Sequence, residues 1–257
     1  MKTSNRKKVS GDRSVSAAVQ CGSNLPKKTE NITSLLTEAY EYQKNRQFEQ
    51  ASFLYQKVVE IDPENIIALN GLGIIAKDTG MISLALDFFK AAYSVNPDNV
   101  TVNRNLGVLY ARLSVYDRAI HHYHAILKAE HDNAEAHGEI ARLYLHAGDT
   151  EKALHHYRCA FRLNPEDPRN FHGLVQLDPQ SVSEEQIKTI EAYLNKPDLP
   201  LNTRCSFYFA LGTIYDRRGK YDEAFANYTV ANLSKGHGFD SNRHADLISH
   251  IIDNFPA

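Results

Sequence analysis

The chain has 257 residues, of which 42% are hydrophobic, and this is enough apolar surface for a continuous core. Its formal net charge is −2, although residues 1–30 carry seven Lys/Arg against two acids. No apolar run reaches the roughly 20 residues that a membrane-spanning helix needs, and no apolar segment typical of a signal peptide follows the first basic residues. Because Cys21, Cys159 and Cys205 show neither paired nor metal-ligand spacing, we expect a reducing compartment and a cytoplasmic location.

Residues 1–30 are polar, rich in Ser and Lys, and show no hydrophobic periodicity. This composition predicts a disordered basic tail. A basic tail can also contact nucleic acid or anionic lipid. Here the tail is short and has no interleaved aromatic residues, so we expect it to be solvated, with no nucleic acid and no membrane as partner.

A fixed sequence period begins after the tail. Pro63 and Pro97 are 34 residues apart, which is one period, and Pro165 follows two periods later. The same period aligns small residues and aromatic residues: Ala51, Ala85, Ala119 and Ala153, and Tyr55, Phe89, Tyr123 and Tyr157. A fixed period of this length is typical of stacked-repeat architectures. The predicted repeats within 31–236 are about 32–65, 66–99, 100–133 and 134–167, a degenerate 168–203, and 205–236.

The apolar spacing predicts two helices in each repeat. In 66–99, apolar spacing predicts a first helix over Ile66–Asp78 and a second over Ile82–Val95. Gly80 breaks the first helix, and proline in the Asn96–Asn99 turn ends the second. We expect the polar side chains of such turns to cap the N-terminal amides of the first helices.

The repeat register changes after residue 167. Two whole periods after Ala134 would place the start of a repeat at position 202. The next clear repeat begins near Cys205, three positions later. The intervening segment still predicts helices, one over Asn170–Gln176 and one opened by a capping box of Ser183 and Gln186. It is a distorted repeat that still fills one step of the stack.

The last predicted element is a C-terminal helix in residues 241–257, whose apolar residues follow helical spacing. They are Leu247, Ile248, Ile251, Ile252 and Phe255. Such a helix either caps the stack or leads into a further domain.

These repeats resemble the tetratricopeptide repeat (TPR) family, whose pattern is W-x2-L-G-x2-Y, then A-x3-F, A and P. The slot for close helix approach holds Ala39, Gly73, Gly107 and Ala141. The chain departs from the pattern because Leu35, Leu69, Asn103, His137 and Tyr208 occupy the Trp slot. The resemblance implies an all-α fold, a right-handed α-solenoid of helix-turn-helix repeats that binds a protein or peptide and has no catalytic residue.

Residues 204–233 also resemble the last repeat of bacterial TPR-sulfotransferase proteins, through Phe209-Ala210-Leu211-Gly212 and Tyr215-Asp216. This resemblance implies an alternative, in which the chain is the non-catalytic N-terminal region of a PAPS-dependent sulfotransferase. The family's Gly-rich phosphate loop after a strand is absent from the sequence, so no catalytic residue is carried over.

In the TPR family the first helices line a concave groove, which is the predicted binding site. Its candidate residues are Tyr40, Lys44, Asn70, Lys77, Arg104, Asn105, Arg112, Arg142 and His146. They form a polar, mildly basic stripe with Asp78, Glu135 and Glu139 as exceptions, which is either a solvated surface or a site for a peptide ligand. The chaperone carboxylate clamp is not assembled, because Leu36 and Tyr40, or Asn70 and Ile74, take its positions.

Twelve histidines include His121-His122 and His155-His156, which occupy equivalent positions in two repeats. They suggest either a metal site or solvent-facing side chains. Because no acid or cysteine completes an evident ligand set, we expect solvent-facing histidines, with no metal and no cofactor.

Overall fold

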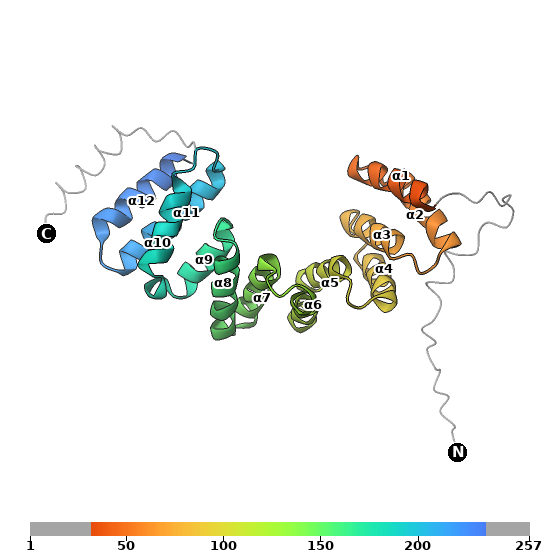
Figure 1. Ribbon diagram of the computed structural model, residues 1–257, viewed down its shortest axis with the longest axis horizontal. Coiled ribbons are helices and arrows are strands. Elements are labelled where there is room, and N and C mark those ends of the chain that lie inside the picture. Colours follow the sequence, from red (N-terminus) through yellow and green to blue (C-terminus); the bar gives the residue numbers. More distant parts are fainter. Residues whose placement is uncertain (1–31, 235–257) are drawn as a thin grey trace, which may run out of the picture. The chain divides into compact units, whose positions relative to one another are not determined.

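The computed structural model describes residues 32–234, and this range is all helical, with no β-strand (Figure 1). The predicted tail 1–30 and the predicted helix in 241–257 lie outside the described residues. Contacts divide the chain at Pro97 and Asp98 into two compact units, which we describe separately as 32–97 and 98–234.

The first unit consists of two helix pairs. Its helices are α1 (Ile32–Lys44), α2 (Phe48–Ile61), α3 (Ile66–Asp78) and α4 (Ile82–Val95). The bounds of α3 and α4 are those that the sequence predicts. The apolar faces of α1, α2 and α3 meet in one core, which includes Ala39, Ala51 and Tyr55.

The second unit continues the pattern with two regular pairs, one irregular segment and a final pair. Its helices are α5 (Val100–Arg112), α6 (Tyr116–Ala129), α7 (Ala134–Ala147), α8 (Thr150–Leu163), α9 (Pro168–Leu177), the 3-10 helix η1 (Pro179–Ser181), α10 (Glu184–Leu194), α11 (Leu201–Arg217) and α12 (Tyr221–Ser234). The predicted helix over Asn170–Gln176 lies within α9, and both hydrogen bonds of the capping box between Ser183 and Gln186 are present.

Small residues stand where the two helices of a pair approach closely. The four alanines aligned by the sequence period, Ala51, Ala85, Ala119 and Ala153, are completely buried. On the partner helix, a Cβ added at Gly73 would lie 2.5 Å from the ring of Phe89. The ring therefore needs a residue without a side chain beneath it, as the sequence pattern indicates.

The turns inside the helix pairs repeat one backbone conformation. Arg46, Gly80, Ser114 and Gly148, each one period after the last, all have φ between 59° and 84°. Glycine adopts this left-handed conformation without steric cost, whereas Arg46 and Ser114 carry a Cβ into it. The two non-glycine turns are thus strained versions of the same connection.

The first helices begin with asparagine caps, as expected from the Asn-containing turns. Asn65, Asn99 and Asn133 accept backbone hydrogen bonds at 3.1, 3.0 and 2.8 Å from residues three positions later. Each cap occupies an amide that would otherwise be free to bind an anion.

The irregular segment still contributes to the core of the second unit. Ile187, Ile190 and Leu194 of α10 belong to the same buried cluster as Phe171 of α9 and Phe207 of α11. The irregular segment therefore packs into the core of the second unit through both of its α-helices.

Candidate functional site

The predicted binding residues lie on the first helices of both units, and in each unit we call the surface that they occupy its first-helix face. In the first unit Tyr40 is 60% exposed and Lys44 is exposed, whereas Asn70 and Lys77 are half-buried. The Lys77 ammonium lies 3.2 Å from the carboxylate of Asp78.

In the second unit two of the predicted arginines, Arg104 and Arg142, are paired with acids. Arg104 of α5 lies 3.3 Å from Glu135 of α7, and Arg142 lies 2.6 Å from Glu139 on its own helix. Arg169 of α9 also approaches Glu139, at 3.9 Å. The stripe that looks mildly basic in the sequence is therefore close to charge-balanced here.

Little enclosed volume accompanies these pairs. A pocket of about 100 Å³ between α7 and α9 is lined by Arg142 together with Glu135, Glu139 and Arg169. This is well below the roughly 300–1,000 Å³ of small-molecule sites. Around Arg142 the first-helix face of the second unit therefore borders only a small pocket.

The remaining predicted residues of this unit differ in their surroundings. Asn105 is half-buried, and Arg112 is exposed at the end of α5. His146 is exposed too, and its ring stacks on Tyr116 with centroids 5.8 Å apart. A cleft of about 500 Å³ on α9 and α11 has none of the predicted residues in its lining.

The paired histidines are not simply solvent-facing. His122 is only 8% exposed, its Nδ1 lies 2.9 Å from Asn103 Oδ1, and its ring stacks on Tyr110. In the next repeat the Nδ1 atoms of His137 and half-buried His156 are 3.0 Å apart. The expectation of solvent-facing histidines is therefore wrong for His122 and His156, although it holds for His121 and His155.

Burial lowers the pKa values of these inward histidines. Desolvation and then neighbouring His121 and Arg118 lower the pKa of His122 to about 4. Desolvation, followed by His137, His124 and His155, lowers the pKa of His156 to about 4. Neutral imidazoles thus form part of the packing, and no group of three His, Cys, Asp or Glu within residues 32–234 is arranged to hold a metal ion.

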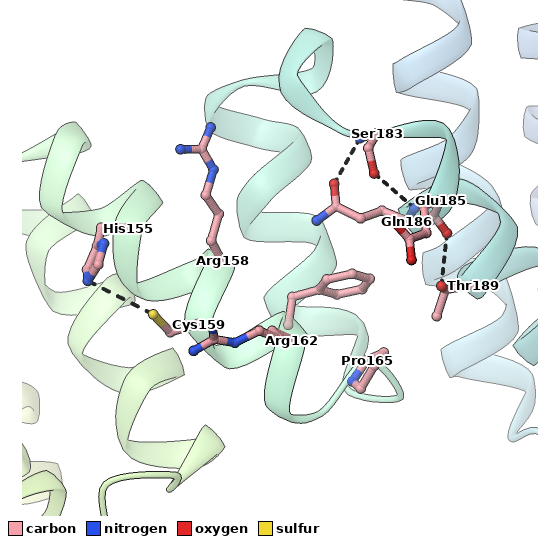
Figure 2. Close-up of a pocket in the computed structure, with 10 residues that line it drawn as sticks. His155, Arg158, Cys159, Arg162, Pro165, Ser183, Glu185, Gln186 and Thr189 are labelled. Atoms are coloured by element: carbon pink, nitrogen blue, oxygen red, sulfur yellow. Dashed lines mark hydrogen bonds between the residues drawn. The ribbon is translucent and has the colours of Figure 1, made fainter.

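A larger site, missed in the sequence, lies between α8 and the N-terminal half of α10 (Figure 2). This α8–α10 cleft has a volume of about 610 Å³. Its lining residues are His155, Arg158, Cys159, Phe161, Arg162, Pro165, Ser183, Glu185, Gln186 and Thr189. The available signal was the irregular segment before α10, in which α9 ends early at Leu177 and η1 follows, although α10 begins one whole period after α8.

The two walls of the α8–α10 cleft differ chemically. On α8, Arg158 donates to Ser181 Oγ at 3.2 Å, and His155 Nε2 lies 4.0 Å from Cys159 Sγ. On α10, Gln186 Oε1 accepts the Ser183 backbone N–H at 2.9 Å, so its NH2 group is the part left for other contacts. Figure 2 shows the Gln186 amide nitrogen on the side of the cleft that faces α8.

None of the helices in residues 32–234 has both the length and the apolar character needed to cross a bilayer.

Comparisons with known proteins agree with this architecture. Two family models described as tetratricopeptide repeat match the chain, one over residues 115–177 and the other over 32–65 and 206–229. An uncharacterized protein from Aquifex aeolicus (strain VF5) is 31% identical over 83 residues, which is 32% of this chain and 11% of that protein. The chain thus corresponds to a small part of this relative.

Solved structures show the same fold at low sequence identity. Pseudomonas aeruginosa pilF matches with a TM-score of 0.61 and 15% identity, covering 84% of this chain and 97% of that one. A crystal structure of MamA matches with a TM-score of 0.51 and 18% identity, covering 77% and 94%. These matches do not support the resemblance to sulfotransferase-linked repeats. The chain carries tetratricopeptide repeats, and its described part has the all-α fold of TPR solenoids.

Proposed function

We propose that this protein is a binding scaffold that holds a protein or peptide partner and performs no chemistry of its own. The proposal is supported by the TPR architecture, because stacked repeats create extended surfaces that are used for binding. No observation favours the sulfotransferase-linked alternative.

The partner site that we propose is the first-helix face of the second unit. The observation that carries the proposal is the pairing of Arg104 with Glu135 and of Arg142 with Glu139, at 3.3 and 2.6 Å. These pairs hold guanidinium forks in place before a ligand arrives, which lowers the entropy cost of binding. Since the pairs are partly exposed, a carboxylate or carbonyl of the partner can compete for the forks at small cost.

The composition of this surface limits the kind of partner. Because acids balance the arginines, we expect a ligand of mixed polarity rather than a strongly acidic tail, in line with the missing chaperone clamp. Tyr40, Lys44, Asn70 and Lys77 stay predicted contacts in the first unit, and Arg112 and His146 stay predicted contacts in the second. Cytoplasmic location is likewise a prediction, which rests on the cysteine pattern.

Site-specific photo-crosslinking tests the proposal. The photoreactive residue p-benzoylphenylalanine replaces Asn105 on α5 or, as a control, exposed Lys128 on α6. In cells of the source organism we expect a discrete crosslinked species from the Asn105 position only. The double change Arg104→Glu and Arg142→Glu should remove that species while circular dichroism stays native. Equal crosslinking from both positions, or none from position 105, would contradict the proposed site.

A further inference from the structure

We propose that the α8–α10 cleft is a second binding site, which takes an extended segment of a partner protein that presents a carboxylate beside an apolar side chain. This inference rests on the proposed binding function, but it does not depend on the first-helix face. The cleft volume of about 610 Å³ lies within the range of ligand sites, so it admits a short peptide segment.

The carboxylate ligand follows from the two arginines of α8. Arg158 and Arg162 are one helical turn apart and both line the cleft. Arg158 is partly engaged, by Ser181 Oγ at 3.2 Å and by Asp178 at 3.9 Å. Arg162 is exposed and has no hydrogen bond or ion pair to another residue in the range 32–234. Its planar fork matches the geometry of a carboxylate, to which it can donate two parallel hydrogen bonds.

The opposite wall offers a second, pre-oriented donor. The capping box holds Gln186 Oε1 against the Ser183 backbone N–H at 2.9 Å, while Ser183 Oγ accepts the Gln186 N–H at 3.2 Å. These bonds fix the amide, and its NH2 group faces α8 across the cleft (Figure 2). A ligand held between Arg162 and Gln186 thus meets donors from both helices.

The apolar part of the ligand follows from two apolar residues of the cleft. Phe161 and Pro165 belong to the lining, and the Phe161 ring is also part of the buried core. An aliphatic side chain placed there gains hydrophobic contact that neither arginine supplies.

The charge balance excludes a highly charged polyanion. Glu185 lines the α10 wall, so the cleft has two arginines against one carboxylate. His155 is an exposed member of the α8 wall. A segment with one or two carboxylates suits this balance, whereas a phosphate backbone would meet repulsion from Glu185.

Cys159 provides a direct reporter of occupancy. It is half-buried in the cleft lining, whereas Cys205 is buried. In the full chain with Cys21→Ser, alkylation of Cys159 by iodoacetamide is followed by mass spectrometry. The probes are the blocked hexapeptide Gly-Glu-Leu-Glu-Leu-Gly and its analogue with Gln in place of both Glu. We expect the acidic peptide to slow alkylation at least fivefold at saturation, and the neutral analogue to change it less than twofold.

Variants of both walls separate this site from its surroundings. Arg162→Glu should weaken the peptide affinity at least tenfold. Gln186→Glu should weaken it at least fivefold while preserving the fold, because glutamate also satisfies a capping box. The control Lys188→Glu makes the same charge change as Arg162→Glu on exposed α10 surface outside the lining, and should stay within twofold.

The outcomes distinguish the two proposals. Protection that survives Arg104→Glu with Arg142→Glu but is lost in Arg162→Glu supports the α8–α10 cleft, whatever the crosslinking at position 105 shows. Equal protection by the acidic and neutral peptides, or no protection by either at millimolar concentration, overturns the carboxylate site. An equal loss in Lys188→Glu would show a diffuse charge effect and overturn it as well.

Discussion

Asn103 and His122 form a buried polar pair in which Oδ1 and Nδ1 are 2.9 Å apart. The Asn103 NH2 group donates to the Asn99 carbonyl at 3.0 Å, which turns its oxygen toward the histidine. Neutral His122 therefore donates from Nδ1. The pair His137 and His156 occupies the same positions one repeat later, with the same sequence separation. In two successive repeats the Trp slot of the TPR pattern therefore holds a polar residue, Asn103 or His137, that contacts a histidine on the second helix.

The first prediction is that acidification destabilises the second unit through these histidines. The folded pKa of His122 is about 4, below the unfolded value of about 6.5. The unfolded state therefore binds more protons, and stability present above pH 6.5 is lost as the pH falls toward 4. No acidic group contributes to the shift of His122 or His156. We expect protonation of each of these two histidines to lower the free energy of unfolding by roughly 1–2 kcal/mol between pH 7 and pH 5.

Urea unfolding followed by circular dichroism at a series of pH values measures this loss. The surface change His121→Gln is the matched control, because His121 is exposed. It should leave most of the pH dependence in place. A stability that is flat between pH 7 and pH 5 would contradict buried neutral histidines.

The second prediction concerns replacement of the polar pair by the apolar pair of the preceding repeat. Leu69 and Phe88 stand one period before Asn103 and His122. Either Asn103→Leu or His122→Phe alone leaves a buried polar atom without its partner, which costs about 1–3 kcal/mol. The double variant removes both polar groups, so we expect its stability to return to within about 1 kcal/mol of the parent.

A double-mutant cycle from urea unfolding checks this coupling. The double variant should also lose the His122 share of the acid sensitivity. If the two single changes are additive, the hydrogen bond between Asn103 and His122 does not contribute to stability as we infer.

The regular part of the fold could be predicted from the sequence because the helix boundaries of each repeat are marked by residues within that repeat. The bounds of α3 and α4, the buried alanines and the asparagine caps all follow from local patterns within a single repeat. The burial of His122 could not be predicted in this way, because His122 is buried through its contact with Asn103 on the other helix of the pair. The period shows that the two positions recur, but no local rule says that they meet.

The candidate sites were less accessible to sequence analysis for a similar reason. Arg104 and Glu135 belong to different repeats, on α5 and α7, so the charge balance of the first-helix face appears only in three dimensions. The α8–α10 cleft depends on how α10 lies against α8 after the short α9 and η1. A shift in register marks an irregular repeat, but it does not say which side chains line the resulting gap.

The third prediction concerns the strained turn at Ser114. This residue has φ of 59°, where the equivalent positions in neighbouring repeats are Gly80 and Gly148. A Cβ in this conformation costs roughly 1–2 kcal/mol, part of which is offset by the greater freedom of glycine in the unfolded chain. Ser114→Gly should therefore stabilise the protein by about 0.5–1 kcal/mol in urea unfolding. Ser94→Gly, inside α4, is the control and should destabilise it by a similar amount.

The last prediction tests the close helix contact that defines the repeat. Ala119 on α6 is completely buried where α5 and α6 approach, and a Cβ added at Gly107 of α5 would lie 2.8 Å from the Tyr123 ring. A longer side chain at position 119 has no space, because the two backbones are held close by these small residues. Ala119→Leu should thus destabilise the fold by about 1–3 kcal/mol through overpacking. Lys128→Ala, an exposed change on the same helix, should stay within about 0.5 kcal/mol. Thermal unfolding of both variants measures the difference, and equal melting temperatures would mean that α6 does not pack on α5 through the face that contains Ala119.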